Sequence, residues 1–332
     1  MNSRRILLLL ASFAVSAALL LLILRDVPVN EVLSSIGAAD PGWLLLSFGL
    51  VAASLLLRGI RWSVLLDRRI PVVPATHMVN VMFLGNQLPL RLGEVARSVL
   101  ATRNRVPLGT AASSIVVERL LDTLIVVLMI AASVGASPEV SERAALFGFF
   151  ALFGFLVLLF FARYPQLAHR ILDGLLGLIP FLGRLPLKAL LVDLLAGLQP
   201  LTDLRALLST VFWTMIAWGV SLGGYYCCLL ALGIETDYLR SVLLGVSLAA
   251  LSLALPVSIA GLGPFEGAIV LSGNIVGMDP LASVSLGFLF HGVSVLSYAI
   301  WGTIGLLALG VSPAAAFRAD ASDNEGERVN PA

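Results

Sequence analysis

Four acidic side chains lie in stretches that are otherwise apolar enough for a lipid bilayer, and three arginines accompany them. The acidic residues are Glu94, Glu118, Asp122 and Glu266. The arginines are Arg91, Arg97 and Arg119. A charge at the bilayer centre costs about 2.5–3.5 kcal/mol even on the most lenient insertion scale, so such residues pair with one another or line a polar path. Together they predict a buried site for a polar or charged ligand.

Glu118, Arg119 and Asp122 share one face of a predicted helix, in the segment SIVVERLLD at residues 114–122. At about 100° per residue, Asp122 lies about 40° and Arg119 about 100° around the axis from Glu118. The rest of the segment is mostly valine, leucine and isoleucine. This stripe is either part of a ligand site or an internal ion pair that locks helices together.

The segment NQLPLRLGEVAR, residues 86–97, interrupts an apolar stretch. Pro89 and Gly93 are expected to break the helix and leave backbone groups free for a ligand. Three charged residues then lie three apart on one face: Arg91, Glu94 and Arg97. The planar arginine fork suits a phosphate, and the Asn86 amide suits a hydroxyl. The alternative is a turn whose charges pair with the acids of residues 114–122.

The segment LPVSIAGLGPFEG, residues 255–267, interrupts a second apolar stretch. Gly261 and Gly263 precede Pro264 at an expected helix start, where free N–H groups favour an anion. Glu266 is either a site residue or a capping residue that suits the helix dipole. His291, in the last apolar stretch, is interpreted as an interhelical hydrogen-bond partner, with proton relay as the alternative.

These residues lie in a chain that predicts an all-α, polytopic integral membrane protein. Hydrophobic residues make up 59% of the 332 residues and charged residues 12%, and about 20 apolar residues span a bilayer as a helix. The six expected transmembrane helices are residues 6–24, 43–60, 109–134, 144–161, 207–232 and 281–309. The first resembles a signal peptide but is expected to remain as an anchor. The interrupted stretches, residues 74–105 and 241–276, fit two re-entrant helical hairpins.

Charge placement predicts the orientation. With the amino terminus in the cytoplasm and both hairpins re-entrant, the outer loops hold only Arg25, Arg143 and Arg240 of the 21 basic residues. This bias follows the positive-inside rule and predicts that both termini are cytoplasmic. The expected location of the protein is the inner membrane of the cell. The hairpins then enter from opposite faces, and each contains Leu-Pro, glycine and glutamate, which indicates an inverted repeat.

We therefore expect one transmembrane domain over residues 1–310. Its halves are residues 1–162 and 206–310, joined by an interfacial linker at residues 163–205. Residues 311–332 are expected to be a disordered cytoplasmic tail. Arg58, Arg61 and Trp62 are interpreted as ordinary interface anchors, and Cys227 with Cys228 as small hydrophobic residues. No zinc-ligand spacing, nucleophile elbow or P-loop is present, so we expect no catalytic residue, metal or cofactor.

Four motifs in order resemble the flippase-like transmembrane region of lysylphosphatidylglycerol synthases. They are RGIRWSVLL (58–66), NQLPLRLGEVAR (86–97), VVERLLD (116–122) and LPVSIAGLGPFEGA (255–268). In the two-domain synthases this region is thought to move an aminoacylated phospholipid between leaflets, while a soluble domain performs the aminoacylation. Only a short tail follows residue 309 here, so the resemblance implies lipid handling without that chemistry. Other members occur beside genes for hopanoid or glycolipid pathways.

The expected function is binding and translocation of a phosphate-bearing lipid, with the arginines compensating the phosphate and the carboxylates holding the arginines. The expected partners are a phospholipid, a hopanoid-related or polyprenyl-linked lipid, and lipid-biosynthesis enzymes. No basic run indicates nucleic acid. Two alternatives stay open. One is a membrane transferase or hydrolase acting on a lipid-linked phosphate, with Glu118 or Asp122 as general base. The other is a non-transporting scaffold of a lipid-synthesis complex.

Overall fold

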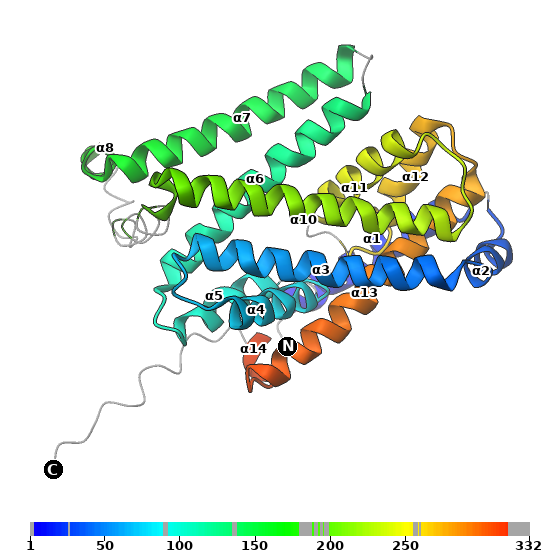
Figure 1. The fold of residues 1–332 in the computed structure, drawn as a ribbon, viewed down its shortest axis with the longest axis horizontal. Helices are drawn as coiled ribbons and strands as arrows, with labels where there is room; N and C mark the ends of the chain where they lie inside the picture. Colours follow the sequence, from blue (N-terminus) through cyan, green and yellow to red (C-terminus); the bar gives the residue numbers. More distant parts are fainter. Residues whose placement is uncertain are drawn as a thin grey trace.

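The computed structural model describes residues 3–25, 27–88, 92–134, 138–178, 199–254 and 260–317, with residues 188, 192, 195 and 258. Every regular element in these ranges is a helix, which confirms the predicted all-α class (Figure 1). Arg91, residues 255–257 and residues 318–332 lie outside the described part of the chain.

Six helices are long, and they coincide with the six predicted transmembrane segments. They are α1 (Ser3–Ile23), α3 (Pro41–Leu65), α6 (Leu108–Val134), α7 (Pro138–Arg163), α10 (Leu204–Ala231) and α13 (Pro280–Ala308). By length and hydropathy, α3, α10 and α13 are long and apolar enough to cross a membrane. Helix α6 has 27 residues but contains three charged residues in its middle. The count of six crossings stays a prediction.

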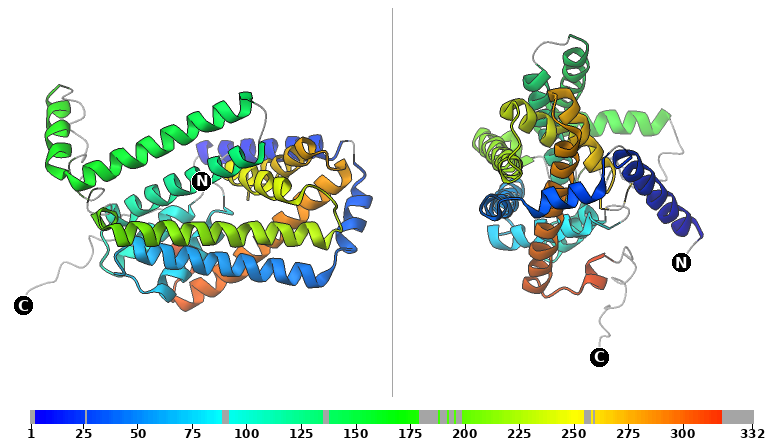
Figure 2. Two further views of the ribbon diagram at one scale, coloured as in Figure 1. Left: turned by 45° about the horizontal axis from the view of Figure 1, so that its top comes forward. Right: turned by 90° about the vertical axis from the view of Figure 1, so that its right-hand side faces the viewer.

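Shorter helices occupy the regions between and after these. They are α2 (Val29–Gly37), α4 (Val72–Gly85), α5 (Gly93–Thr102), α8 (Pro165–Leu178), η3 (Gln199–Thr202), α11 (Tyr238–Ala254), α12 (Pro264–Val276) and α14 (Pro313–Phe317). Helix α8 lies in the predicted linker and turns by 103° from α7 (Figure 2). Helix α14 forms the start of the predicted tail, with Ala316 buried.

The three helices that are long and apolar enough to cross a membrane begin in the same way. Asp40, Asp203 and Asp279 precede α3, α10 and α13, and each accepts a hydrogen bond from a backbone N–H of the first turn. The distances are 2.7 Å to Gly42, 3.0 Å to Ala206 and 3.1 Å to Ala282. An aspartate at this position pairs a donor that the helix itself leaves free. Local chemistry therefore fixes these three starts.

The long and short helices form the same pattern twice, as a long helix, a broken pair and a second long helix. The first set is α3, α4–α5 and α6, and the second is α10, α11–α12 and α13. Helix α4 packs on α13 of the other set, and α11 packs on α6. Helices α3 and α10 run antiparallel side by side, joined by Ser47 Oγ to the Gly224 carbonyl at 2.8 Å (Figures 1 and 2). This reciprocal packing supports the internal repeat, and membrane re-entry of the broken pairs stays a prediction.

Glycine lets the broken pair α4–α5 approach α3. A methyl group on Gly59 of α3 would meet Cα of Thr76 on α4 at 2.6 Å, closer than carbon atoms pack. Gly49, on the exposed side of the same helix, has nothing within 4 Å of that position. The two glycines therefore have the same intrinsic helix propensity, but only Gly59 lies in close contact with another helix.

We expect Gly59→Ala to destabilise the protein by about 1–3 kcal/mol, because the added methyl must push α3 and α4 apart. Gly49→Ala should leave stability unchanged or raise it by up to about 1 kcal/mol, since alanine favours helix. Thermal unfolding of both variants in the same detergent tests this. Equal melting temperatures would show that the α3–α4 contact is not as close as described.

Candidate functional site

The centre of the site is a network of buried ion pairs between three helices. Arg61 of α3 lies 2.7 Å from Asp122 Oδ1 and 3.3 Å from Glu118 Oε1, both on α6. Arg97 of α5 pairs with the other oxygen of Glu118. All four residues are buried. Charges removed from water are tolerated only when they are paired, so each of these side chains holds its partners in place.

Two tryptophans complete the network. Trp218 of α10 donates its indole N–H to Asp122 Oδ1 at 3.0 Å, which brings a fourth helix to the same carboxylate. Trp62 of α3 donates to the Ser114 hydroxyl at 2.9 Å, and its ring lies 4.6 Å from the guanidinium carbon of Arg97. A guanidinium over an indole face gains a cation–π interaction. Residues of α3, α5, α6 and α10 thus hold the charged side chains in fixed orientations.

A cavity of about 400 Å³ opens beside this network, between the two sets of helices. Its polar wall contains Arg58, Asn86, Glu94, Arg119, Asp122, Ser221, Ser294 and Tyr298. Helices α11 and α12 contribute only apolar residues, namely Val246, Ala249, Ala250, Leu251, Leu253 and Phe265. Along α6 the lining changes from Arg119 and Asp122 to Val126, and along α13 from Tyr298 to Phe290. The cavity therefore has a charged region and an apolar region.

Arg58 is a partly buried arginine that borders the cavity, with its side chain 14% exposed. Its nearest carboxylate oxygen is Asp122 Oδ2 at 3.8 Å, and Asp122 is already bound by Arg61 and Trp218. The rings of Phe83 and Trp218 lie 5.7 Å and 5.3 Å from its guanidinium carbon. Arg58 is thus held in position by aromatic rings while its charge is only weakly paired.

Arg119 and Glu94 form a second, looser pair at the cavity wall. The Arg119 Nε lies 3.5 Å from Glu94 Oε1, and the two side chains are 44% and 31% exposed. An exposed pair of this kind contributes little to stability and can exchange partners. Within the described residues, four arginines face three carboxylates here: Arg58, Arg61, Arg97 and Arg119 against Glu94, Glu118 and Asp122. One positive charge is in excess.

The second predicted tip forms a separate site. Glu266 is fully buried, accepts a hydrogen bond from the Gly263 N–H at 2.8 Å, and lies 2.5 Å from Nδ1 of His291 on α13. The capping interpretation of Glu266 and the interhelical hydrogen bond of His291 are confirmed. Gly261 and Gly263 have φ of 81° and 89°, which favours glycine. The Gly263 N–H is used by the chain's own carboxylate, so the predicted anion site at this glycine is wrong.

The predicted residues therefore divide into three groups. Asn86, Glu94, Arg119 and Asp122 line the cavity, and Arg97 with Glu118 lies behind it. Gly261, Gly263 and Glu266 belong to the separate site on α12 and α13. Arg91 lies outside the described residues. The four acids therefore do not form a single cluster in the structure.

Sequence reasoning did not place Arg58, Arg61, Trp62 or Trp218 at the site. Arg58 and Arg61 were expected to be interface anchors, but Arg61 is 1% exposed and is central to the ion pairs. The missed signal is spacing: Arg58, Arg61 and Trp62 lie on one face of a helix. Trp218 had no distinguishing sequence signal.

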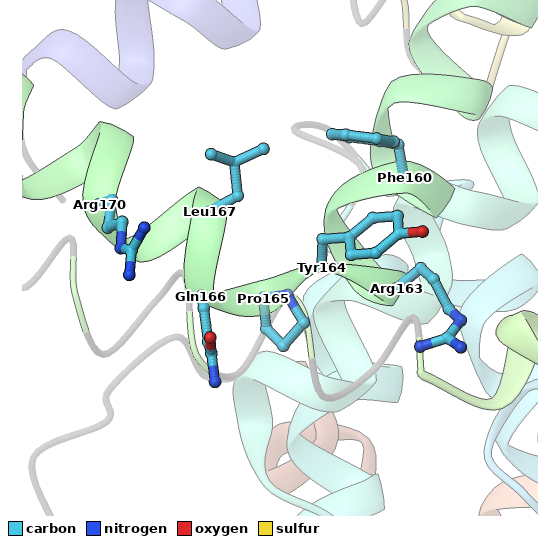
Figure 3. Close-up of a pocket in the computed structure, with 7 residues that line it drawn as sticks. All are labelled: Phe160, Arg163, Tyr164, Pro165, Gln166, Leu167 and Arg170. Atoms are coloured by element: carbon cyan, nitrogen blue, oxygen red, sulfur yellow. The ribbon is translucent and has the colours of Figure 1, made fainter.

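Another hollow lies at the turn between α7 and α8 (Figure 3). It is lined by Phe160, Arg163, Tyr164, Pro165, Gln166, Leu167 and Arg170. None of the predicted site residues belongs to it. Its place in the linker region fits an interfacial position, and it has no part in the ion-pair network.

The sequence matches the family described as "Lysylphosphatidylglycerol synthase TM region" over residues 9–302. It is also 28% identical over 349 aligned positions to a protein of Haloferax volcanii named "Glycosyltransferase AglD". That alignment covers 90% of this chain but 54% of the relative, so the chain spans about half the relative's length.

Removing one acid from the network tests its structural role. We expect Glu118→Gln to lower the free energy of unfolding by about 3–5 kcal/mol, because Arg97 and Arg61 would remain buried without a full counter-charge. The same change at the exposed pair, Glu94→Gln, should cost at most about 1 kcal/mol. Unfolding in mixed detergent micelles measures both. Similar losses in the two variants would contradict the distinction between buried and exposed pairs.

Proposed function

Because the family match covers most of its length, the chain belongs to the lysylphosphatidylglycerol synthase transmembrane region family, and we propose that it binds and translocates a phosphate-bearing lipid. The proposed ligand places its headgroup in the charged region of the central cavity and the start of its chain in the apolar region. Membership of this family supports a membrane protein that handles lipid. The ligand and its movement are our proposal.

The observation that supports the proposal most directly is the division of the cavity into charged and apolar walls. A water-soluble anion would leave the wall of α11 and α12 without a partner, and a hydrocarbon would add no partner for the weakly paired Arg58 or the loosely paired Arg119. An amphipathic anion satisfies both walls. A cavity of about 400 Å³ suits a drug-sized ligand, hence a headgroup with the first part of its chain.

Arg58 and Arg119 are the proposed phosphate ligands. A guanidinium stays charged when desolvated and donates two parallel hydrogen bonds to an oxyanion. Arg58 is weakly paired, and Arg119 can exchange Glu94 for the ligand because that pair is exposed. The Asn86 amide and the Tyr298 and Ser294 hydroxyls, on the same wall, suit the hydroxyl groups of a glycerol or sugar headgroup.

The buried network acts indirectly in this proposal. Asp122 is fixed by Arg61 and Trp218, so it keeps its position when the Arg58 guanidinium turns towards a ligand. Movement of the headgroup past Arg58 and Arg119 would then change neither the ion pairs nor the packing of α3, α5, α6 and α10. The chain of the lipid would stay beside the apolar wall.

A second candidate is a transferase acting on a lipid-linked phosphate, favoured by the name of the Haloferax relative, a glycosyltransferase. The arginine partners of Glu118 and Asp122, the two acids proposed as general base, argue against it. Glu118 and Asp122 are both bound by arginines, and an acid held as a paired carboxylate is a poor proton acceptor. Among the described residues, no group of three His, Cys, Asp or Glu side chains could hold a metal ion. Turnover of polyprenyl phosphate by the purified chain would favour the transferase.

Binding is tested with phosphatidylglycerol and native mass spectrometry. We expect Arg58→Gln to weaken binding about tenfold or more, since a hydrogen bond to a charged group is lost. Binding of diacylglycerol, which has no phosphate, should not change. Arg25→Gln is the matched control because it removes an exposed arginine outside the cavity. Equal affinity of Arg58→Gln and Arg25→Gln for phosphatidylglycerol would refute the proposed headgroup site.

Translocation is tested separately in vesicles that contain a fluorescent phosphatidylglycerol. The chain and its Arg25→Gln variant should accelerate exchange between leaflets, whereas Arg58→Gln should slow it. Ala250→Phe should slow it as well, because the ring fills the apolar region of the cavity. Exchange at the same rate in all four samples and in protein-free vesicles would mean that the protein binds lipid without moving it.

A further inference from the structure

Glu266 and His291 form a hydrogen-bonded chain with two further groups of the second tip. The Gly263 N–H donates to Glu266 Oε2 at 2.8 Å, and Glu266 Oε1 lies 2.5 Å from His291 Nδ1. His291 Nε2 lies 3.0 Å from the carbonyl oxygen of Ala260. The side chains of Glu266 and His291 are 1% and 6% exposed. The contact between Glu266 and His291 is therefore buried, and the contact of His291 with the Ala260 carbonyl is partly buried.

The two contacts of the His291 ring require two hydrogens. The contact with the Ala260 carbonyl needs an N–H on Nε2, because a carbonyl oxygen only accepts. The contact between Nδ1 and Glu266 Oε1 needs a second hydrogen, on either atom. A neutral imidazole has one N–H and an ionised carboxylate has none. One additional proton must therefore lie between Nδ1 and Oε1, either on an imidazolium or on a carboxylic acid.

We infer that Glu266 and His291 are a proton-binding site that latches the turn of residues 260–266 to α13. Without the proton, one of the two contacts places acceptor against acceptor in a buried position, and each such contact costs more than a lost hydrogen bond. The inference does not depend on the proposed lipid function. Within that function, it would supply a means of coupling to protons.

The turn contains a strained residue beside its own backbone hydrogen bond, which runs from the Phe265 N–H to the Gly261 carbonyl at 3.0 Å. Ala260 has φ of 55°, a left-handed conformation that costs energy in a residue other than glycine. The His291 contact stabilises the Ala260 carbonyl in this conformation. Phe265, at the end of the turn, stacks on the His291 ring at 4.4 Å and also lines the cavity. Release of the turn would therefore change the apolar wall of the cavity.

The close contacts of the turn's glycines with α1 and α11 are to apolar side chains and a backbone carbonyl. Gly263 faces the Ser16 carbonyl and the Leu19 side chain of α1, and Gly261 faces Leu253 of α11. On α13, Gly287 lies against the Glu266 backbone. In the described part of the chain, Glu266 and His291 form their only ion pair with each other.

The proton count can be tested by NMR of the chain labelled with ¹⁵N-histidine. The sequence has three histidines, so a chain with His77→Gln and His169→Gln retains His291 alone. We expect either two protonated ring nitrogens or an infrared band of a buried carboxylic acid that disappears in Glu266→Gln. A neutral His291 ring beside an ionised Glu266 at every pH from about 5 to 9 would overturn the inference.

The latch can be tested by cysteine labelling in a chain in which Cys227 and Cys228 are alanine. Ser16→Cys places a thiol beneath the turn, where Ser16 is 6% exposed, and Phe13→Cys is an exposed reference on the same helix. Thiol ionisation rises with pH at both positions, so the ratio of the two maleimide rates isolates access. This ratio should rise severalfold as the proton is lost.

Two variants make this test decisive. Glu266→Gln should keep the rate ratio low at every pH, because the amide accepts from Gly263 and donates to Nδ1 with no added proton. His291→Phe should keep it high at every pH, because both contacts are removed. The protein that retains Glu266 and His291 is compared with the Glu266→Gln variant. If its rate ratio is as independent of pH as the ratio of that variant, the latch is overturned. A pH-dependent ratio in a chain that binds no phosphatidylglycerol would refute the lipid proposal alone.

Discussion

The interaction on which the structure depends is the sharing of the Arg61 guanidinium between Glu118 and Asp122. Through these two carboxylates, α6 is joined to α3 by Arg61, to α5 by Arg97 and to α10 by Trp218. In an apolar environment these groups have no alternative partners, so their pairing fixes the relative positions of four helices. Apolar contacts alone would specify this arrangement less strictly, because leucine and lipid differ little as packing partners.

The two halves of the chain use the same arrangement with different chemistry. In each half the return arm of the broken pair is attached to the following long helix by a buried side-chain contact: Arg97 with Glu118, and Glu266 with His291. A guanidinium remains protonated at any physiological pH, so the first attachment is permanent. The second attachment is the one that we infer to bind a proton. The central cavity lies between a permanently fixed half and a half that we infer to be adjustable.

The position of the cavity follows from this difference. Its charged wall is built on the fixed half, where Arg58 and Arg119 lie beside the ion-pair network. Its apolar wall is built on α11 and α12 and ends at Phe265, which stacks on His291. Headgroup recognition requires donors in constant positions, whereas an apolar wall can change shape at lower cost. In the proposed function, the rigid half recognises phosphate and the other half accommodates the chain.

The class, the helices and the polar content of the site could be predicted from short stretches of the sequence. Aspartate caps, Pro-Gly breaks and long apolar runs act over a few residues, so six long helices and two broken pairs could be predicted from them. Asn86, Glu94, Arg119 and Asp122 could be named because a charged or polar side chain in an apolar stretch needs a reason. The predicted nest at Gly263 failed because Glu266, three residues away, reaches back to the same N–H.

Only the tertiary structure decided which charges meet. Arg61 and Asp122 are 61 residues apart, and Trp218 is 96 residues from Asp122, so no local pattern relates them. In the structure Glu266 also lies apart from the other acids and contacts His291 instead. Partner choice among buried charges depends on how helices that are distant in sequence pack, because a desolvated charge binds whichever counter-charge the packing brings within reach.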